Sequence, residues 1–192
     1  MTLLILGLVL FLGIHSVRIV ADSARDRFIA TRGKGAWKGL YSLASAAGLF
    51  CIVWGYGAAR AEPVVLWAPL AGTRPLAVAL MLLAFILIVA AYVPGNGIKA
   101  RLHHPMVLSV MAWAAAHLLV RNTLAAVLLF GSFGVWAALS FRAARQRDAA
   151  ARVVYAAGRL PATAIAVVVG TAAWAAFSRW GHGAWIGVQP LS

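Results

Sequence analysis

Three histidines lie in or beside strongly apolar stretches of this 192-residue sequence. His15 lies in LGIHSVRIV and His117 in WAAAHLLV, while His104 directly precedes Pro105 at the start of the second of these stretches. Ionisable side chains inside a membrane are costly and often mark a functional site. Buried imidazoles can hydrogen-bond to a neighbouring helix, ligate a metal, or relay protons along a solute path. The residues alone leave these three interpretations open.

The spacing of the histidines shows which of them can act together. His104 and His117 are separated by about 20 Å along one helix, so they do not form a local metal site. A shared site therefore needs a histidine from another helix. His15 and His117 lie most clearly within apolar stretches, and two imidazoles from different helices can clamp a planar cofactor such as b-type haem.

Basic and aromatic residues accompany both histidines. Arg18 follows His15 by three residues and is expected on the same helix face. Trp113 and Arg121 lie four residues before and after His117, which predicts a stripe of Trp, His and Arg along one face. In the haem interpretation, the arginines are candidates to meet the propionates near either membrane surface.

The four acidic residues do not suggest a paired-carboxylate enzyme. Asp22 and Asp26 are one helical turn apart and lie beside Arg18 and Arg25, which predicts an ion-pair ladder at the end of the first helix. Cys51 is the single cysteine, so it cannot form an internal disulfide, and it is interpreted as a small apolar packing residue.

The composition is that of a polytopic membrane protein. The sequence is 64% hydrophobic, only 11% of its residues are charged, and its mean hydropathy is +0.90. The net charge of +13 is gathered in short clusters between long apolar runs, which excludes a nucleic-acid-binding surface as its main explanation. The lipid bilayer is therefore the first expected partner.

The apolar runs predict an all-α integral membrane bundle of about six transmembrane helices, with five as the alternative. The whole chain, residues 1–192, is expected to form one transmembrane domain. A core of five helices would occupy residues 1–141, followed by a basic interfacial segment and a sixth helix in residues 142–192. The predicted spans are Leu3–Val20, Trp37–Ala59, Leu76–Val93, Pro105–Val120, Thr123–Phe141 and Pro161–Trp180. The first is interpreted as a retained helix rather than a signal peptide, because it lacks a charged start.

The basic residues predict the orientation of these spans. Three connections are heavily basic, around residues 25–38, 99–101 and 142–159, and an alternating topology puts all three on one side. By the positive-inside rule this side is the cytoplasm, which places both termini in the periplasm of a bacterial inner membrane. His15 then lies near the inner end of its span and His117 near the outer end, with an offset approaching about 10 Å. His104 matches His15 better in depth and is kept as a rival ligand.

Six segments carry a resemblance to a known family. In chain order they are GIHSVRIVADSARDRFIA, AWKGLYSLASAAGL, IVWGYG, AYVPGNGIKARLHHPM, WAAAHLL and LLFGSF. They resemble the NnrU family, from Leu6 to about Ala138, with the last span as a more variable extension. Bacterial members are associated with denitrification, through nitric oxide and nitrite metabolism. The same segments are similar to the membrane core of 15-cis-zeta-carotene isomerase, a haem b protein with histidine axial ligands.

This resemblance implies haem b held by iron ligands at His15 and His117, with the His-Pro motif at His104 and Pro105. Three functions follow from it. The first is a haem-binding protein linked to denitrification, the second a haem-dependent cis-trans isomerase of a lipophilic polyene, and the third a non-catalytic helper in assembly of a respiratory or denitrification complex. The sequence does not predict an oligomeric state or a substrate.

Two further segments have local interpretations. AYVPGNGIKARL breaks a helix and presents Asn96, Lys99 and Arg101, either as an interfacial turn or as an anion site. FRAARQRDAAARVVYAAGRL predicts a basic helix lying on the anionic inner leaflet. His182, between glycines, is expected in a solvated loop.

Overall fold

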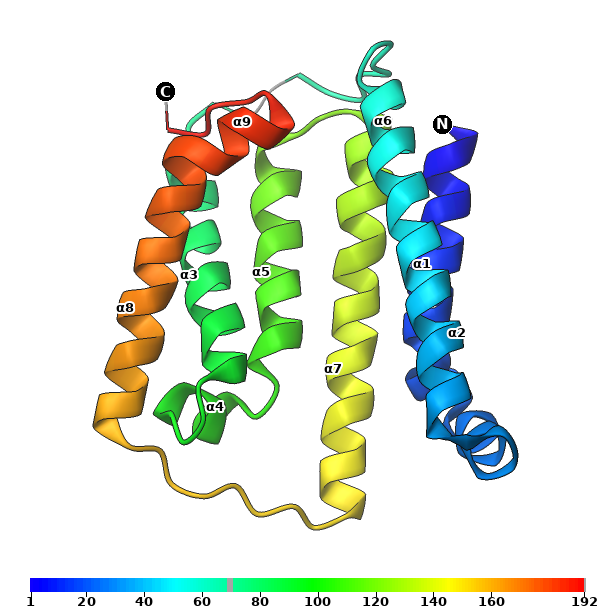
Figure 1. Ribbon diagram of the computed structural model, residues 1–192. Helices are drawn as coiled ribbons and strands as arrows, with labels where there is room; N and C mark the ends of the chain where they lie inside the picture. Colours follow the sequence, from blue (N-terminus) through cyan, green and yellow to red (C-terminus); the bar gives the residue numbers. More distant parts are fainter. Residues whose placement is uncertain (69–70, 192) are drawn as a thin grey trace. The chain divides into compact units, whose positions relative to one another are not determined.

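The computed structural model describes residues 1–68 and 71–191, and helices dominate them (Figure 1). Extended pairing within these residues is limited to two isolated bridges, between Val65 and Thr123 and between Asn96 and Arg159. The elements are α1 Thr2–Val20, α2 Asp22–Ala59, α3 Arg74–Tyr92, α4 Gly97–Leu102, α5 Pro105–Val120, α6 Leu124–Ala126, the π-helical turn η1 Val127–Gly131, α7 Ser132–Ala150, α8 Leu160–Ala176, the π-helical turn η2 Phe177–Gly181 and α9 His182–Ile186.

The predicted all-α membrane bundle of about six helices is confirmed. Five helical segments among the described residues are long and apolar enough to cross a membrane, and α5 is a shorter apolar helix. Two of the five are continuous across π-helical turns, Leu124–Ala150 and Leu160–Ile186. The second span is longer than predicted because α2 starts at Asp22, but Gly33 interrupts it with φ 85° and ψ 157°. Such a positive φ is open to glycine at little cost, so the kink sits where the sequence permits it.

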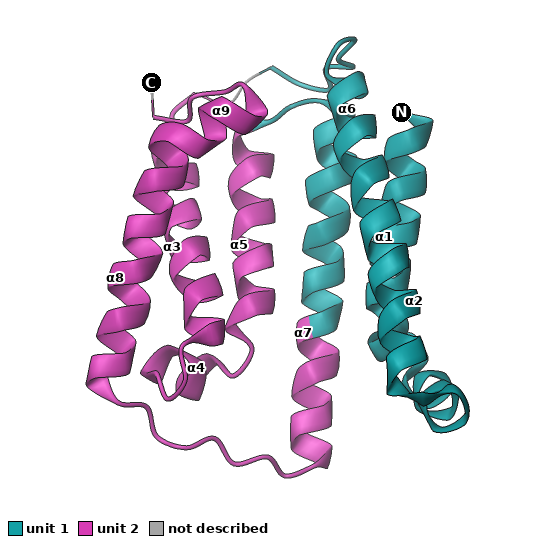
Figure 2. Ribbon diagram, viewed as in Figure 1, with its two compact units in different colours: residues 1–69, 121–140 teal, residues 70–120, 141–192 magenta. Residues whose placement is uncertain are grey.

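The chain divides into two compact units (Figure 2). Unit 1 comprises residues 1–69 and 121–140, and unit 2 comprises residues 70–120 and 141–192, within the described part of the chain. The helix α7 contributes its first part to unit 1 and its last part to unit 2.

In unit 1, α1 and α2 pack closely because glycines face the opposing backbone. A Cβ added to Gly48 would lie 2.7 Å from the Phe11 nitrogen, and one added to Gly55 would lie 2.4 Å from the Leu4 nitrogen. Gly7 faces α2 in the same way, at Ile52. Without a hydrophobic effect between lipid-immersed helices, such small residues permit the close van der Waals contact that holds them together.

In unit 2, α3 packs against both α5 and α8. Gly170 of α8 lies against the backbone of Ile86 in α3, where an added Cβ would be 2.6 Å from the Ile86 Cα. Asn96 is 1% exposed and links the end of α3 to the start of α4. Its amide donates to the carbonyl oxygens of Ala90 and Val93, at 2.8 and 2.6 Å, and its side-chain oxygen accepts from the Lys99 amide at 2.8 Å. Asn96 is therefore a structural cap with satisfied hydrogen bonds, which agrees with the interfacial-turn interpretation.

Two local predictions were wrong. The basic segment after residue 141 is not one interfacial helix, because α7 continues to Ala150 and Arg152 then adopts φ 48°. His182 does not lie in a loop, because η2 carries α8 into α9, where His182 is the first residue. Its Nδ1–H donates to the Val188 carbonyl at 2.6 Å across the turn that follows Ile186, where Gly187 has φ 75°.

Candidate functional site

His15 lies in the C-terminal part of α1, in unit 1, and one of its ring nitrogens is engaged in a hydrogen bond. Its Nδ1 is 2.7 Å from the carbonyl oxygen of Phe11, one turn earlier in the same helix. A carbonyl oxygen only accepts, so Nδ1 carries the proton and Nε2 of the neutral ring carries the lone pair. Among the described residues, no hydrogen bond to Nε2 occurs. This is the arrangement of metal-ligating histidines, whose second nitrogen is commonly fixed by a backbone carbonyl.

Aromatic rings from three helices of unit 1 surround the imidazole of His15. Phe11 of α1 stacks on it with ring centroids 4.2 Å apart, Tyr41 of α2 lies 4.9 Å away, and Trp136 of α7 meets it edge-on at 6.0 Å and 86°. These contacts restrict the ring's orientation. Tyr41 and Trp136 were not predicted as site residues from the sequence. The available sequence signal for Trp136 was a tryptophan within the predicted span Thr123–Phe141.

His117 lies in unit 2 with the same local hydrogen bond. Its Nδ1–H donates to the carbonyl oxygen of Trp113, one turn earlier in α5, at 2.8 Å, and the two rings are 5.3 Å apart. The predicted stripe along this helix ends at His117, because α5 stops at Val120 and Arg121 follows the helix, in unit 1. His15 and His117 belong to different units, so their pairing on one iron stays a prediction from the sequence.

His104, the rival ligand, is held by a carboxylate that was not predicted as its partner from the sequence. Its Nε2 is 2.7 Å from Asp148 Oδ2, and the Tyr155 hydroxyl donates to the same oxygen at 2.8 Å. The side chains of His104 and Asp148 are only 22% and 19% exposed. A carboxylate accepts, so Nε2 carries the proton and Nδ1 is the remaining nitrogen. The sequence signal for this partner was the position of Asp148 as a single acidic residue in a segment rich in arginine.

His103 belongs to the same cluster in unit 2. Its ring stacks on Tyr155 at 4.0 Å and 1°, and Arg145 donates to its Nδ1. Burial, followed by the hydrogen bond to Asp148 and the charge of that residue, raises the pKa of the Tyr155 phenol above its usual range. The phenol therefore stays protonated and donating at neutral pH, and its stabilising effect is lost only when the pH rises through this raised pKa. The cluster ties residues 151–159 to the start of α5.

Replacement of Asp148 by alanine is expected to release this connection. His104 and Tyr155 lose their shared acceptor, which weakens the connection between residues 151–159 and the start of α5. Cleavage by trypsin after the exposed Arg152 should then accelerate about tenfold or more, measured by mass spectrometry of the fragments over time. Asp26→Ala is the matched control, because Asp26 is 67% exposed and pairs with Arg25. Equal cleavage rates in the wild type and Asp148→Ala would contradict a role for Asp148 in holding this segment.

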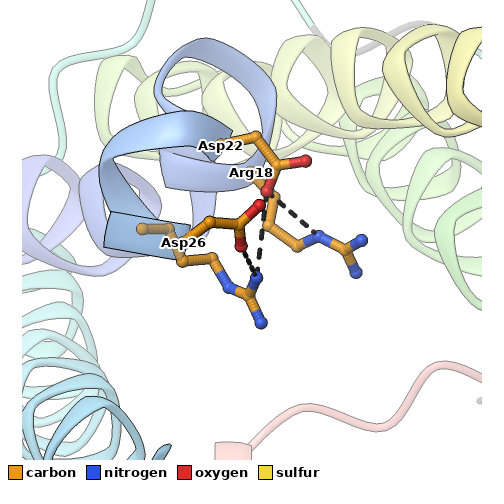
Figure 3. A network of polar contacts seen from close by, with 4 residues as sticks. Arg18, Asp22 and Asp26 are labelled. Carbon is orange, nitrogen blue, oxygen red and sulfur yellow. Dashed lines mark hydrogen bonds and ion pairs between the residues drawn. The ribbon is translucent and has the colours of Figure 1, made fainter. Parts of the chain in front are cut away.

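The predicted ion-pair ladder at the end of α1 is confirmed (Figure 3). Arg18 Nε lies 3.7 Å from Asp22 Oδ1, Arg25 approaches the same oxygen at 4.0 Å, and Arg25 also pairs with Asp26 at 2.7 Å. These groups connect α1 to the start of α2 across the break at Ala21. Their partial exposure keeps their contribution to stability small. Arg18, a predicted propionate partner, therefore already has a carboxylate neighbour.

The histidines do not assemble a site for a bare metal ion among the described residues. No group of three or more His, Cys, Asp and Glu side chains converges there. A porphyrin iron makes a different demand, because the macrocycle supplies four of its ligands and the protein adds one imidazole on a face.

The comparison with family models decides the family. The model described as NnrU protein matches residues 3–190, nearly the whole chain. This chain belongs to the NnrU family. The match extends beyond the region from Leu6 to about Ala138 that carries the resemblance, and it includes α8 and α9 of this NnrU family member. No curated protein and no solved structure matches the chain.

Proposed function

We propose that this NnrU family member is a haem b-binding protein of the bacterial inner membrane, linked to denitrification through nitric oxide or nitrite metabolism. The observation that carries the proposal is the state of His15. Its Nδ1–H is satisfied within its own helix, and its Nε2 has no hydrogen-bond partner among the described residues. A histidine whose role was to bridge helices would instead direct a ring nitrogen to another helix.

The residues around His15 fit the chemistry of a porphyrin. The imidazole offers a neutral Nε2 to iron, and Phe11, Tyr41 and Trp136 supply flat apolar surfaces beside it. His117 is proposed as a further candidate ligand, because its Nδ1–H is fixed by Trp113 in the same way. When bound, haem would supply redox chemistry or a binding site for a small diatomic molecule. The protein's part is to fix the imidazole tautomer and exclude water.

The membrane and orientation are proposed from charge. The multi-pass helices support a bilayer location, and the basic connections support a cytoplasmic side for residues 25–38, 99–101 and 142–159. With six spans, both termini are then periplasmic. The link to denitrification rests on the family, because its bacterial members are associated with denitrification.

Absorption spectra of the detergent-purified protein test the proposal. Protein from haem-supplied cells should show a Soret band, with sharp bands after reduction by dithionite. His15→Ala and His117→Ala should lose or shift these bands, because each removes a proposed ligand. His104→Ala should retain them, because His104 is engaged with Asp148, and His182→Ala is a control histidine hydrogen-bonded to the turn after α9.

Three results would change the proposal. Absence of a Soret band in the haem-supplied wild type would overturn haem binding. Loss of the bands only in His104→Ala would move the iron to the opposite end of α5 from His117. Conversion of added zeta-carotene between its cis and trans forms, measured by chromatography, would replace the denitrification role by polyene isomerisation.

A further inference from the structure

Two polar atoms on the helices whose rings contact His15 are buried without hydrogen-bond partners. They are the indole Nε1 of Trp136 in α7 and the hydroxyl oxygen of Ser45 in α2, and neither has a partner among the described residues. Both lie within membrane-spanning helices of unit 1. In lipid no water satisfies such groups, so an unpaired donor there is costly and calls for a bound partner.

The Trp136 ring contacts His15, and the position of Ser45 on α2 follows from its neighbours. The Trp136 ring lies edge-on to the imidazole, with centroids 6.0 Å apart. Ser45 is one turn beyond Tyr41, whose ring is 4.9 Å from that of His15. Gly48, three residues further along α2, lies against the Phe11 backbone. Tyr41, Ser45 and Gly48 therefore share one face of α2, and this face packs against the turn of α1 between Phe11 and His15.

The chemistry of these two groups defines the partner. An indole N–H can only donate, and a serine hydroxyl can also donate, so the ligand must present an acceptor. A carboxylate is the strongest acceptor for such donors, because the hydrogen bonds are charge-assisted. Haem carries two propionates, and they are the part of the cofactor that apolar helices accommodate least well.

We propose that Trp136 and Ser45 donate hydrogen bonds to a haem propionate beside His15. This inference rests on the proposed haem binding. It assigns the propionate to neutral donors within unit 1 rather than to Arg18, which was the candidate from the sequence and which lies beside Asp22. Both residues anchor the cofactor's edge, whereas His15 is directed at its iron.

Titration of the haem-free purified protein with two porphyrins tests the assignment. One is haem b, and the other is haem dimethyl ester, which has the same iron and macrocycle but no carboxylates. Trp136→Phe keeps one aromatic ring and removes the indole N–H, and its loss of ring volume affects both porphyrins alike. It should therefore weaken binding of haem b about tenfold or more and change binding of the ester much less. Ser45→Ala should act in the same direction. The Soret band reports binding, and circular dichroism reports helicity.

Matched controls lie in the same unit. Trp54→Phe makes the same change at a tryptophan that is 65% exposed, and Ser42→Ala makes it at an exposed serine three residues from Ser45. Neither should alter the affinity for either porphyrin. If Trp136→Phe fails to fold, the propionate assignment is decided by whether Ser45→Ala weakens binding of haem b more than binding of the ester.

The outcomes separate the two proposals. Binding of neither porphyrin by the wild type overturns haem binding and the propionate assignment with it. Binding of both, with equal effects of Trp136→Phe and Ser45→Ala on haem b and on the ester, overturns the propionate assignment alone. A selective loss of haem b affinity supports both.

Discussion

Gly55→Ala should disrupt unit 1 more than alanine at the other glycines between α1 and α2, Gly7 and Gly48. The added Cβ would lie 2.4 Å from the Leu4 nitrogen and 2.8 Å from the Leu3 carbonyl carbon, and neither is a flexible side-chain end that can move away. The helices α1 and α2 must therefore separate, at a cost of about 3 kcal/mol. Because close contact at small residues holds these helices together in lipid, the separation weakens the whole interface.

The single cysteine reports this separation. Cys51 lies opposite Gly7 in the same interface, so its labelling by a membrane-permeant maleimide should accelerate severalfold in Gly55→Ala. The melting temperature in detergent should fall as well. Gly57→Ala is the matched control, because an added Cβ there meets no atom within 4 Å. Equal labelling rates in the two variants would contradict the proposed packing.

Asn96→Ala should destabilise unit 2 by about 3 kcal/mol. The change removes two donors from the carbonyl oxygens of Ala90 and Val93 and one acceptor from the Lys99 amide, all at a residue that is 1% exposed. Buried groups left without partners bear the full cost of desolvation. The end of α3 and the start of α4 should both fray, measured by hydrogen exchange of their amides and by thermal unfolding in detergent.

A second variant separates the two roles of Asn96. Asn96→Asp keeps the acceptor for Lys99 but brings a carboxylate against two carbonyl oxygens, so it should be at least as destabilising as alanine. Asn122→Ala is the matched control, because the Asn122 side chain donates to the Trp67 carbonyl in a more exposed position. A stability of Asn96→Ala equal to that of Asn122→Ala would show that the cap is dispensable.

Much of the fold was predictable because apolar length and charge are properties of local sequence. A run of about 20 apolar residues has few alternatives to a membrane helix, so the spans and the bundle followed from composition. The ion-pair ladder of Arg18, Asp22 and Asp26 was also predictable, because each member lies about one turn from the next.

Errors arose where a local pattern competed with contacts from elsewhere. The basic segment after residue 141 has helical composition, yet residues 151–159 are not helical, since Tyr155 bonds to Asp148 and the Arg159 amide bonds to the Gly95 carbonyl. The second of these partners, Gly95, lies outside the segment, so the segment's own sequence does not indicate it. The same applies to His182, whose helix depends on the continuation of α8 through η2.

For the candidate site, the sequence specified the elements and the residue types: apolar helices, histidines within them, and the family that their order identifies. Tertiary structure decided how those residues are used. It left His15 Nε2 without a hydrogen bond, engaged His104 with Asp148, and brought Trp136 beside the His15 imidazole. The physical reason is that helix formation depends on neighbours in the chain, whereas hydrogen-bond partners and ring contacts depend on which helices meet.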